Sequence, residues 1–124
     1  MTTTVDDRAD RLFHALAHRT RRDILRRSMV EEHSISELAE AYDMSFAAVQ
    51  KHVSVLHRAG LLSKRRKGRQ ALASGNVEAI RSAAALLREL EDLWRGRIAR
   101  IEDLLAADES GRQSLSPDPN KPKK

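Results

Sequence analysis

The sequence predicts a mainly helical fold with one small β-hairpin, and three observations indicate it. Hydrophobic residues make up 40% of the chain but aromatic residues only 3%, so the core is built from Leu, Ile, Val and Ala, which favours packing of helix on helix. Apolar residues recur at helical spacing in several separate stretches. Gly68 separates two short segments in the manner of a hairpin tip.

The first half of the chain contains start signals for three helices. Apolar residues at helical spacing predict a first helix from about Val5 to His18. Thr20 is a good N-cap for a second helix, which ends near Glu31. Ser34, with Glu37 three residues further on, is a capping-box pattern and predicts a short third helix.

A fourth helix and a hairpin follow. Ser45 is the expected N-cap of the helix, which runs to about Arg58, and its buried side would hold Val49, Val53 and Leu56. Gly60 stands where the end of a helix favours a left-handed residue. The hairpin is expected over residues 61–73.

The last predicted helix runs from about Val77 to Ala107. Leu87, Trp94 and Ile101 are spaced by seven residues, which is typical of a helix that pairs with another helix. About 30 residues exceed what is needed to cover a small core, so a second copy of the chain is the simplest partner. We therefore expect one domain over residues 1–107 and a disordered tail, rich in Ser, Gly, Pro and Lys, over residues 108–124.

The distribution of charge indicates a polyanionic partner. No acidic residue lies between Asp43 and Glu78, a stretch that contains seven lysines and arginines, whereas both signs are mixed elsewhere. Two short helices joined by a tight turn and followed by a basic hairpin describe a winged helix-turn-helix, in which the fourth helix enters the major groove of DNA.

Side chains of two kinds are expected at double-stranded DNA. Predicted on the recognition helix are Ser45, Phe46, Ala47, Gln50, Lys51, Ser54 and Arg58. Predicted as wing and backbone contacts are Arg21, Arg22, Lys64, Arg65, Arg66, Lys67 and Arg69. Gln50 could form a bidentate pair with adenine, whereas the wing cations would position the protein without reading sequence.

Several other kinds of function are disfavoured. The chain has no cysteine, which excludes disulfides and thiolate metal sites, and we find no catalytic motif, so no cofactor and no enzymatic activity are expected. No stretch is long and apolar enough to span a membrane, and no secretory signal is apparent, which favours the cytoplasm. His14 and His18 have a spacing that can bind metal, but without a third ligand we interpret them as surface or dimer-contact histidines.

The segments 17–25, 36–39, 44–56 and 58–62 together resemble the ArsR-type (ArsR/SmtB) winged-helix repressors. The resemblance covers about Leu12 to Ala107. It implies a homodimer joined through the first and last helices that represses genes, often its own operon, from an inverted-repeat operator. Arg19 replaces the proline usual in the family. The third helix lacks cysteine and the last helix lacks histidine, so the chain resembles the non-metal-sensing branch and no metal is expected.

The expected dimer interface combines the apolar faces of the first and last helices. Its predicted residues are Leu12, Phe13, Leu16, Leu87, Leu90, Trp94, Ile98, Ile101 and Leu105. An alternative function is that of a helical dimer whose basic face binds an acidic protein. The sequence identifies neither the operator nor a small-molecule effector, and it leaves activation open beside repression.

Overall fold

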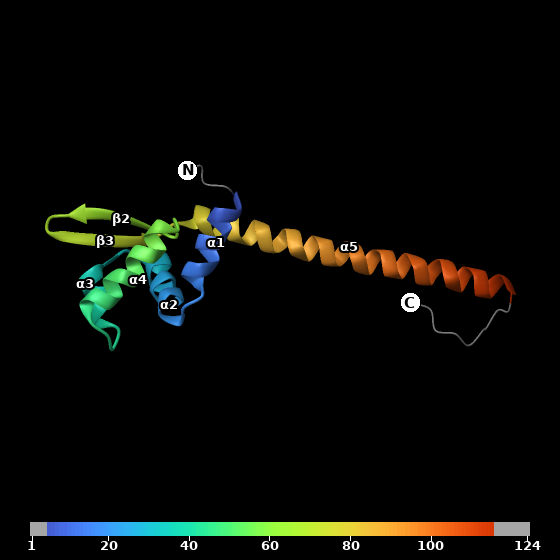
Figure 1. The fold of residues 1–124 in the computed structure, drawn as a ribbon, viewed down its shortest axis with the longest axis horizontal. Coiled ribbons are helices and arrows are strands. Elements are labelled where there is room, and N and C mark those ends of the chain that lie inside the picture. Colours follow the sequence, from blue (N-terminus) through green and yellow to red (C-terminus); the bar gives the residue numbers. More distant parts are fainter. Residues whose placement is uncertain (1–4, 116–124) are drawn as a thin grey trace. The chain divides into compact units, whose positions relative to one another are not determined.

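The computed structural model describes residues 5–115, and the predicted mainly helical fold with a small sheet is confirmed (Figure 1). The helices are α1 (Val5–Leu16), α2 (Arg19–Val30), α3 (Ile35–Glu40), α4 (Phe46–Arg58) and α5 (Val77–Leu115). The strands are β1 (His33–Ser34), β2 (Leu62–Lys67) and β3 (Gln70–Gly75). The chain divides into two compact units, Met1–Ala85 and Leu86–Lys124.

Local capping chemistry sets the starts of the short helices. The hydroxyl of Ser34 accepts a hydrogen bond from the N–H of Glu37 and the Glu37 side chain returns to the Ser34 N–H, so the predicted capping box is confirmed. The prediction that Thr20 caps α2 is wrong. The N-cap is His18, which has an extended backbone and whose Nδ1 accepts the N–H of Thr20 at 3.1 Å, because the helix already begins at Arg19.

The small sheet has the order β1-β3-β2 and is antiparallel throughout. Gly68 at the hairpin tip has a φ of +63°, which favours glycine, and the pairing of Lys67 with Gln70 closes the turn. Strand β1 was not predicted, because two residues are too few to show an alternating pattern. It places Ser34 opposite Leu72.

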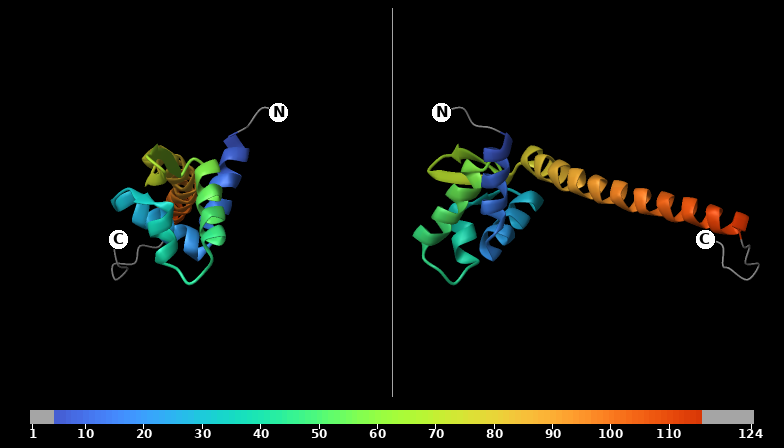
Figure 2. Two further views of the ribbon diagram at one scale, coloured as in Figure 1. Left: turned by 90° about the vertical axis from the view of Figure 1, so that its left-hand side faces the viewer. Right: turned by 45° about the vertical axis from the view of Figure 1, so that its right-hand side comes forward.

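In the first unit, helices α1, α2 and α3 lie around α4 (Figure 2), and the core lies between them. Helices α1, α2 and α3 and strand β2 all contact α4, while β3 contacts α2 and α3. The side chains of Ile24, Leu38, Val49, Val53, Leu56 and Leu61 are the large apolar groups that are fully buried. Burying each of them stabilises the fold by about 1.5–3 kcal/mol, so the orientation of α4 is fixed by packing on every inner side.

Helix α5 continues for 39 residues, to Leu115. The prediction of an end near Ala107 is therefore wrong. Polar residues after Ala107 are compatible with a helix, and the first proline after Val77 is Pro117. The rest of the predicted tail, residues 116–124, lies outside the described residues. None of the helices in the described part has the combination of length and apolar content needed to cross a membrane.

Candidate nucleic-acid interface

Helix α4 has one buried face, which orients the opposite one. Val49, Val53 and Leu56 follow each other at intervals of four and three residues, and all three are fully buried. The hydroxyl of Ser45 accepts the N–H of Ala48 at 3.1 Å, so this side chain starts the helix as predicted. The outer face of α4 is thereby held in one direction.

The outer face carries most of the side chains predicted to meet DNA. Phe46 is 49% exposed, and Ala47, Gln50 and Lys51 are also exposed. Ser54 is half-buried toward the edge of this face, and Arg58 is exposed at its C-terminal end. The open surface therefore combines an aromatic ring, a methyl group, an amide and an ammonium group, which suit contacts to base edges in a major groove.

Tyr42, in the turn between α3 and α4, ties this pair of helices to α2. Its hydroxyl donates to Oδ2 of Asp23 at 2.5 Å, and Nε of Arg27 donates to the same oxygen at 2.9 Å. The hydrogen bonds from Tyr42 and then Arg27 lower the pKa of Asp23. Burial, followed by the bond to Asp23, raises the pKa of Tyr42 to about 12. These contacts fix the turn, and with it the angle of α4.

The wing formed by β2 and β3 presents cations along an edge strand. Lys64 pairs with Ala73 and Arg66 pairs with Ala71. The small alanine side chains cover little of the aliphatic part of the lysine and arginine side chains. The five wing cations Lys64, Arg65, Arg66, Lys67 and Arg69 are all exposed, as their predicted role requires. Their number and exposure suit contacts with a phosphate backbone.

One wing cation has a carboxylate partner in the same chain. Nε of Arg65 donates to Oε2 of Glu32 at 2.8 Å, and Nη2 donates to Oε1 at 2.6 Å. The hydrogen bond from Arg65 lowers the pKa of Glu32. The ion pair fixes the position of β2 relative to the segment before β1. Because Glu32 partly neutralises Arg65, Arg65 attracts another anion, such as a phosphate, less strongly.

Arg21 and Arg22 are engaged with the end of α1. Nε of Arg21 donates to the carbonyl of Ala15 at 2.8 Å and its Nη2 to that of His14 at 2.9 Å. Nη1 of Arg22 donates to the carbonyl of Leu16 at 2.8 Å. Cations at the C-terminal carbonyls of a helix satisfy acceptors and complement its dipole. We therefore leave both arginines, predicted as backbone contacts, out of the proposed interface.

The apolar residues predicted for the dimer interface differ in exposure. Leu12 is 6% exposed and packs into the chain's own core, which corrects its prediction as a surface contact. Phe13 is 36% exposed and Leu16 is half-buried. On α5, Leu87, Leu90, Trp94, Ile101 and Leu105 are exposed and Ile98 is half-buried. Leu93 and Leu104, which were not predicted, are exposed as well. Such a stripe indicates a surface that another molecule covers.

A family model described as "Bacterial regulatory protein, arsR family" matches residues 18–64, from the cap of α2 into β2. Residues 18–64 are thus similar to the arsR family of bacterial regulatory proteins. The chain is similar to the crystal structure of an ArsR family transcriptional regulator, with 29% identity and a TM-score of 0.70 over 76% of this chain and 97% of that one. The chain is also similar to an ArsR-like transcriptional regulator from Rhodococcus sp. RHA1. Identity is 27% and the TM-score is 0.70, over 78% of this chain and 92% of that one.

A further similar structure is the homodimeric winged helix-turn-helix DNA-binding domain of a possible ArsR-family transcriptional regulator from Mycobacterium bovis. Identity is 25% and the TM-score 0.57, over 69% of this chain and 80% of that one. No curated protein sequence matched the chain. These similar structures are those of transcriptional regulators, and one is described as a winged helix-turn-helix domain, so the predicted winged helix-turn-helix fold is confirmed.

Two histidines within residues 18–64 connect α4 to the corner between α1 and α2. The rings of His18 and His52 lie 4.5 Å apart, and Nη1 of Arg21 lies 3.4 Å from Nδ1 of His52. Burial, followed by the charge of His18, lowers the pKa of His52. Within residues 5–115, no group of three or more His, Asp or Glu side chains could hold a metal ion. His18 instead serves as a cap.

Sequence reasoning missed Glu32 as the partner of a wing cation. It lies 33 residues from Arg65, so no local pattern connects the two. The available signal was indirect: Glu32 is an acidic residue just ahead of the long acid-free stretch, in a chain whose wing is densely cationic.

Proposed function

We propose that the chain acts as a homodimeric repressor that binds double-stranded DNA at an inverted-repeat operator and controls its own operon. Helix α4 would lie in the major groove, with the β2–β3 wing along the backbone. The observation that carries the proposal is the open face of α4, followed directly in the chain by an exposed cationic wing, with no acidic residue from Met44 to Val77.

The two parts of this surface would have different tasks. Phe46, Ala47 and Gln50 are exposed and uncharged, so they suit contacts to thymine methyl groups and adenine edges. Lys64, Arg66, Lys67 and Arg69 are exposed cations without an ion pair in the described part of the chain, so they suit phosphates. Arg65 would share its charge between Glu32 and DNA.

The proposed dimer is supported by the apolar residues that α5 leaves exposed. Trp94 is 57% exposed, and Leu90 and Leu105 are exposed to a similar degree. Helices with such a stripe pair with one another in water. The similar domain from Mycobacterium bovis is described as homodimeric. A two-fold dimer would place its two recognition helices about 34–36 Å apart, one turn of DNA.

Repression and autoregulation rest on the resemblance to the ArsR-type repressors, as does a non-metal-sensing mode of action. The absence of cysteine from the chain supports the latter, because one type of metal sensor in this family uses cysteine thiolates. We also propose a cytoplasmic location, which DNA binding in a bacterial cell requires.

Binding to DNA from upstream of the chain's own gene tests the proposal. We expect fluorescence anisotropy to give a tighter complex with that duplex than with a shuffled duplex, with affinity falling steeply as salt increases. Footprinting should then protect two half-sites related by inversion. A lack of any preference for the upstream duplex, measured with a verified dimer, would contradict sequence-specific regulation and favour an acidic protein partner. A reporter fused to the upstream DNA should be more active when the gene is deleted; lower activity would indicate an activator.

A further inference from the structure

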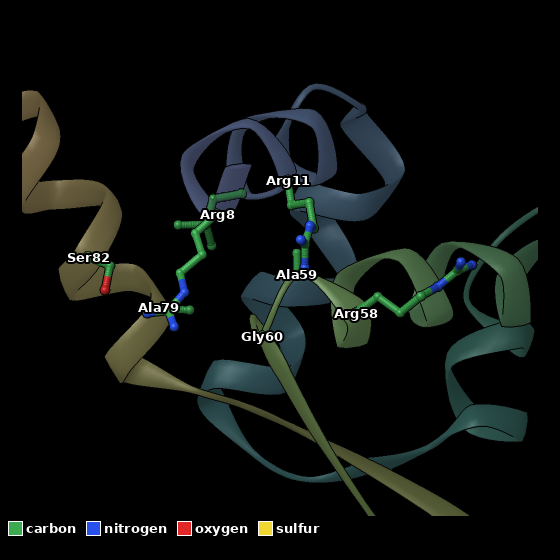
Figure 3. A pocket seen from close by; sticks show the side chains of 8 residues that line it. Arg8, Arg11, Arg58, Ala59, Gly60, Ala79 and Ser82 are labelled. Atoms are coloured by element: carbon green, nitrogen blue, oxygen red, sulfur yellow. The ribbon is translucent and has the colours of Figure 1, made fainter. Parts of the chain in front are cut away.

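A cavity of about 410 Å³ lies in the first unit, on the side of α1, away from the proposed base readers (Figure 3). Its lining comes from α1 (Arg8, Arg11, Leu12), the end of α4 (Arg58, Ala59, Gly60) and the start of α5 (Ala79, Ser82). A second space of about 220 Å³ shares Arg11, Arg58 and Ala59 with it. Three separate elements therefore build one pocket, and Arg58 is its one lining residue that is also predicted to meet DNA.

The lining is cationic. It contains three arginines, and none of the described lining residues is acidic. Figure 3 shows Arg8 and Arg11 extending from α1 toward the end of α4 and the start of α5, whereas the side chain of Arg58 runs away from them. In the described part of the chain, the guanidinium of Arg8 has no hydrogen bond or ion pair. An arginine guanidinium beside a cavity can form two parallel hydrogen bonds with the carboxylate of a bound molecule.

The remaining lining is largely apolar. Leu12, Ala59 and Ala79 contribute hydrocarbon surface, and Ser82 contributes a hydroxyl. The volume lies in the range of about 300–1,000 Å³ that is typical of small-molecule sites, which combine an apolar lining with a few polar groups. An inorganic anion would leave most of this space and its apolar surface unused.

We propose that this cavity binds a small organic anion, a carboxylate attached to an apolar body. The carboxylate would pair with Arg8, whose guanidinium can donate two parallel hydrogen bonds to its two oxygens. The apolar body would lie against Leu12, Ala59 and Ala79. The inference goes beyond the proposed function and does not depend on it, since binding can be measured without DNA.

Hydrogen bonds at the end of α4 lessen the repulsion that its terminal carbonyls would exert on an anion. The N–H of Gly60 donates to the carbonyl of His57 and the N–H of Leu61 to that of Leu56, both at 3.0 Å, so two of the terminal carbonyls are already paired. Gly60 has a φ of +81° and joins α4 to β2. An occupant would thus contact the junction between the recognition helix and the wing.

Calorimetry on the full chain tests the proposal with benzoate, octanoate, benzyl alcohol and inorganic phosphate as probes. We expect at least one of the two carboxylates to bind at millimolar or lower concentration, and to bind at least about tenfold more tightly than benzyl alcohol, which lacks the charge, and than phosphate, which lacks the apolar body. Failure of both carboxylates to bind at 10 mM, or equal binding of benzyl alcohol, would overturn it.

Variants locate the binding. Arg8→Gln should weaken carboxylate binding by about tenfold or more, and Ala79→Leu, which fills the cavity, should also weaken it. Arg19→Gln is the matched control, because Arg19 is an exposed arginine outside the cavity, and it should bind like the parent chain. If Arg8→Gln changes the dimer dissociation constant but leaves carboxylate binding intact, the arginines serve a second copy of the chain and the proposal is wrong.

Discussion

Arg65 and Glu32 form a two-pronged ion pair that spans the sheet, because Glu32 lies directly before β1, Arg65 lies in β2, and β3 runs between these strands. The Glu32 carboxylate thus holds one cation of the wing from within the chain. In an exposed position such a pair contributes little to stability, so its main effect is on the position and the available charge of the wing.

Glu32→Gln should strengthen DNA binding, because it removes a negative charge that competes with phosphates for Arg65. We expect affinity at low salt to rise by about two- to fivefold and the salt dependence to steepen by about one counterion. Anisotropy titrations at several salt concentrations measure both. Glu89→Gln, the same change at an exposed position on α5, should have no effect. Weaker binding by Glu32→Gln would mean that the pair serves to hold the wing in a binding position.

Arg66→Ala should weaken binding to operator and shuffled duplexes by the same factor. Arg66 is exposed on the wing and reaches no base edge in the proposed geometry, so about three- to tenfold is expected at 0.1 M salt, with the salt slope reduced by about one. Arg88→Ala, on α5, serves as the control for loss of a positive charge. A loss confined to the operator duplex would assign Arg66 a role in base recognition.

Gln50→Ala should reduce the preference for the operator. A bidentate amide contact to adenine discriminates by about 1–3 kcal/mol, and Gln50 is exposed on the outer face of α4, so the stability of the fold should not change. The quantity to measure is the ratio of affinities for operator and shuffled duplexes. Equal losses on both duplexes would show that Gln50 does not read bases.

Stability should fall as the pH decreases below about 6.5, in part through His52. Burial and His18 lower the pKa of His52 in the folded chain. The unfolded chain therefore takes up a proton at a pH where the folded one does not, which favours unfolding as the pH falls below the usual histidine pKa of about 6.5. Urea unfolding at pH 7.5 and pH 5.5 should show a smaller difference for His52→Gln than for the parent chain. His57→Gln, on the exposed end of the same helix, should retain the parent difference.

Tyr42 should ionise at unusually high pH. Its pKa is raised to about 12 by burial and by the hydrogen bond to Asp23. The neutral phenol thus stabilises the fold fully below pH 10, and this contribution is lost as the pH rises from about 10 to about 12. Because the chain has one tyrosine, absorbance at the wavelength of tyrosinate reports Tyr42 alone. We expect the midpoint of the absorbance change to lie at a clearly higher pH in the folded chain than in the urea-unfolded chain. Identical midpoints would contradict the Tyr42–Asp23 bond.

Elements with strong local signals were predicted correctly. Ser34 and Ser45 cap helices as expected, Gly60 has a positive φ, and Val49, Val53 and Leu56 are buried on one face of α4. Each of these features depends on residues a few positions apart, because helical periodicity and capping act within one or two turns. The exposed cations of the wing likewise follow from their own segment.

Only the tertiary structure decided which partners the charged and apolar groups have. Leu12 lies in the chain's own core rather than on the surface, and Arg21 binds carbonyls at the end of α1. Arg65 meets Glu32 across the sheet, and Arg8 comes to line a cavity with residues of α4 and α5. The sequence by itself thus determined the kind of element and the sign of each surface. Packing decided which side chains remain available, because contacts between residues far apart in the chain exist only once the core has oriented its helices.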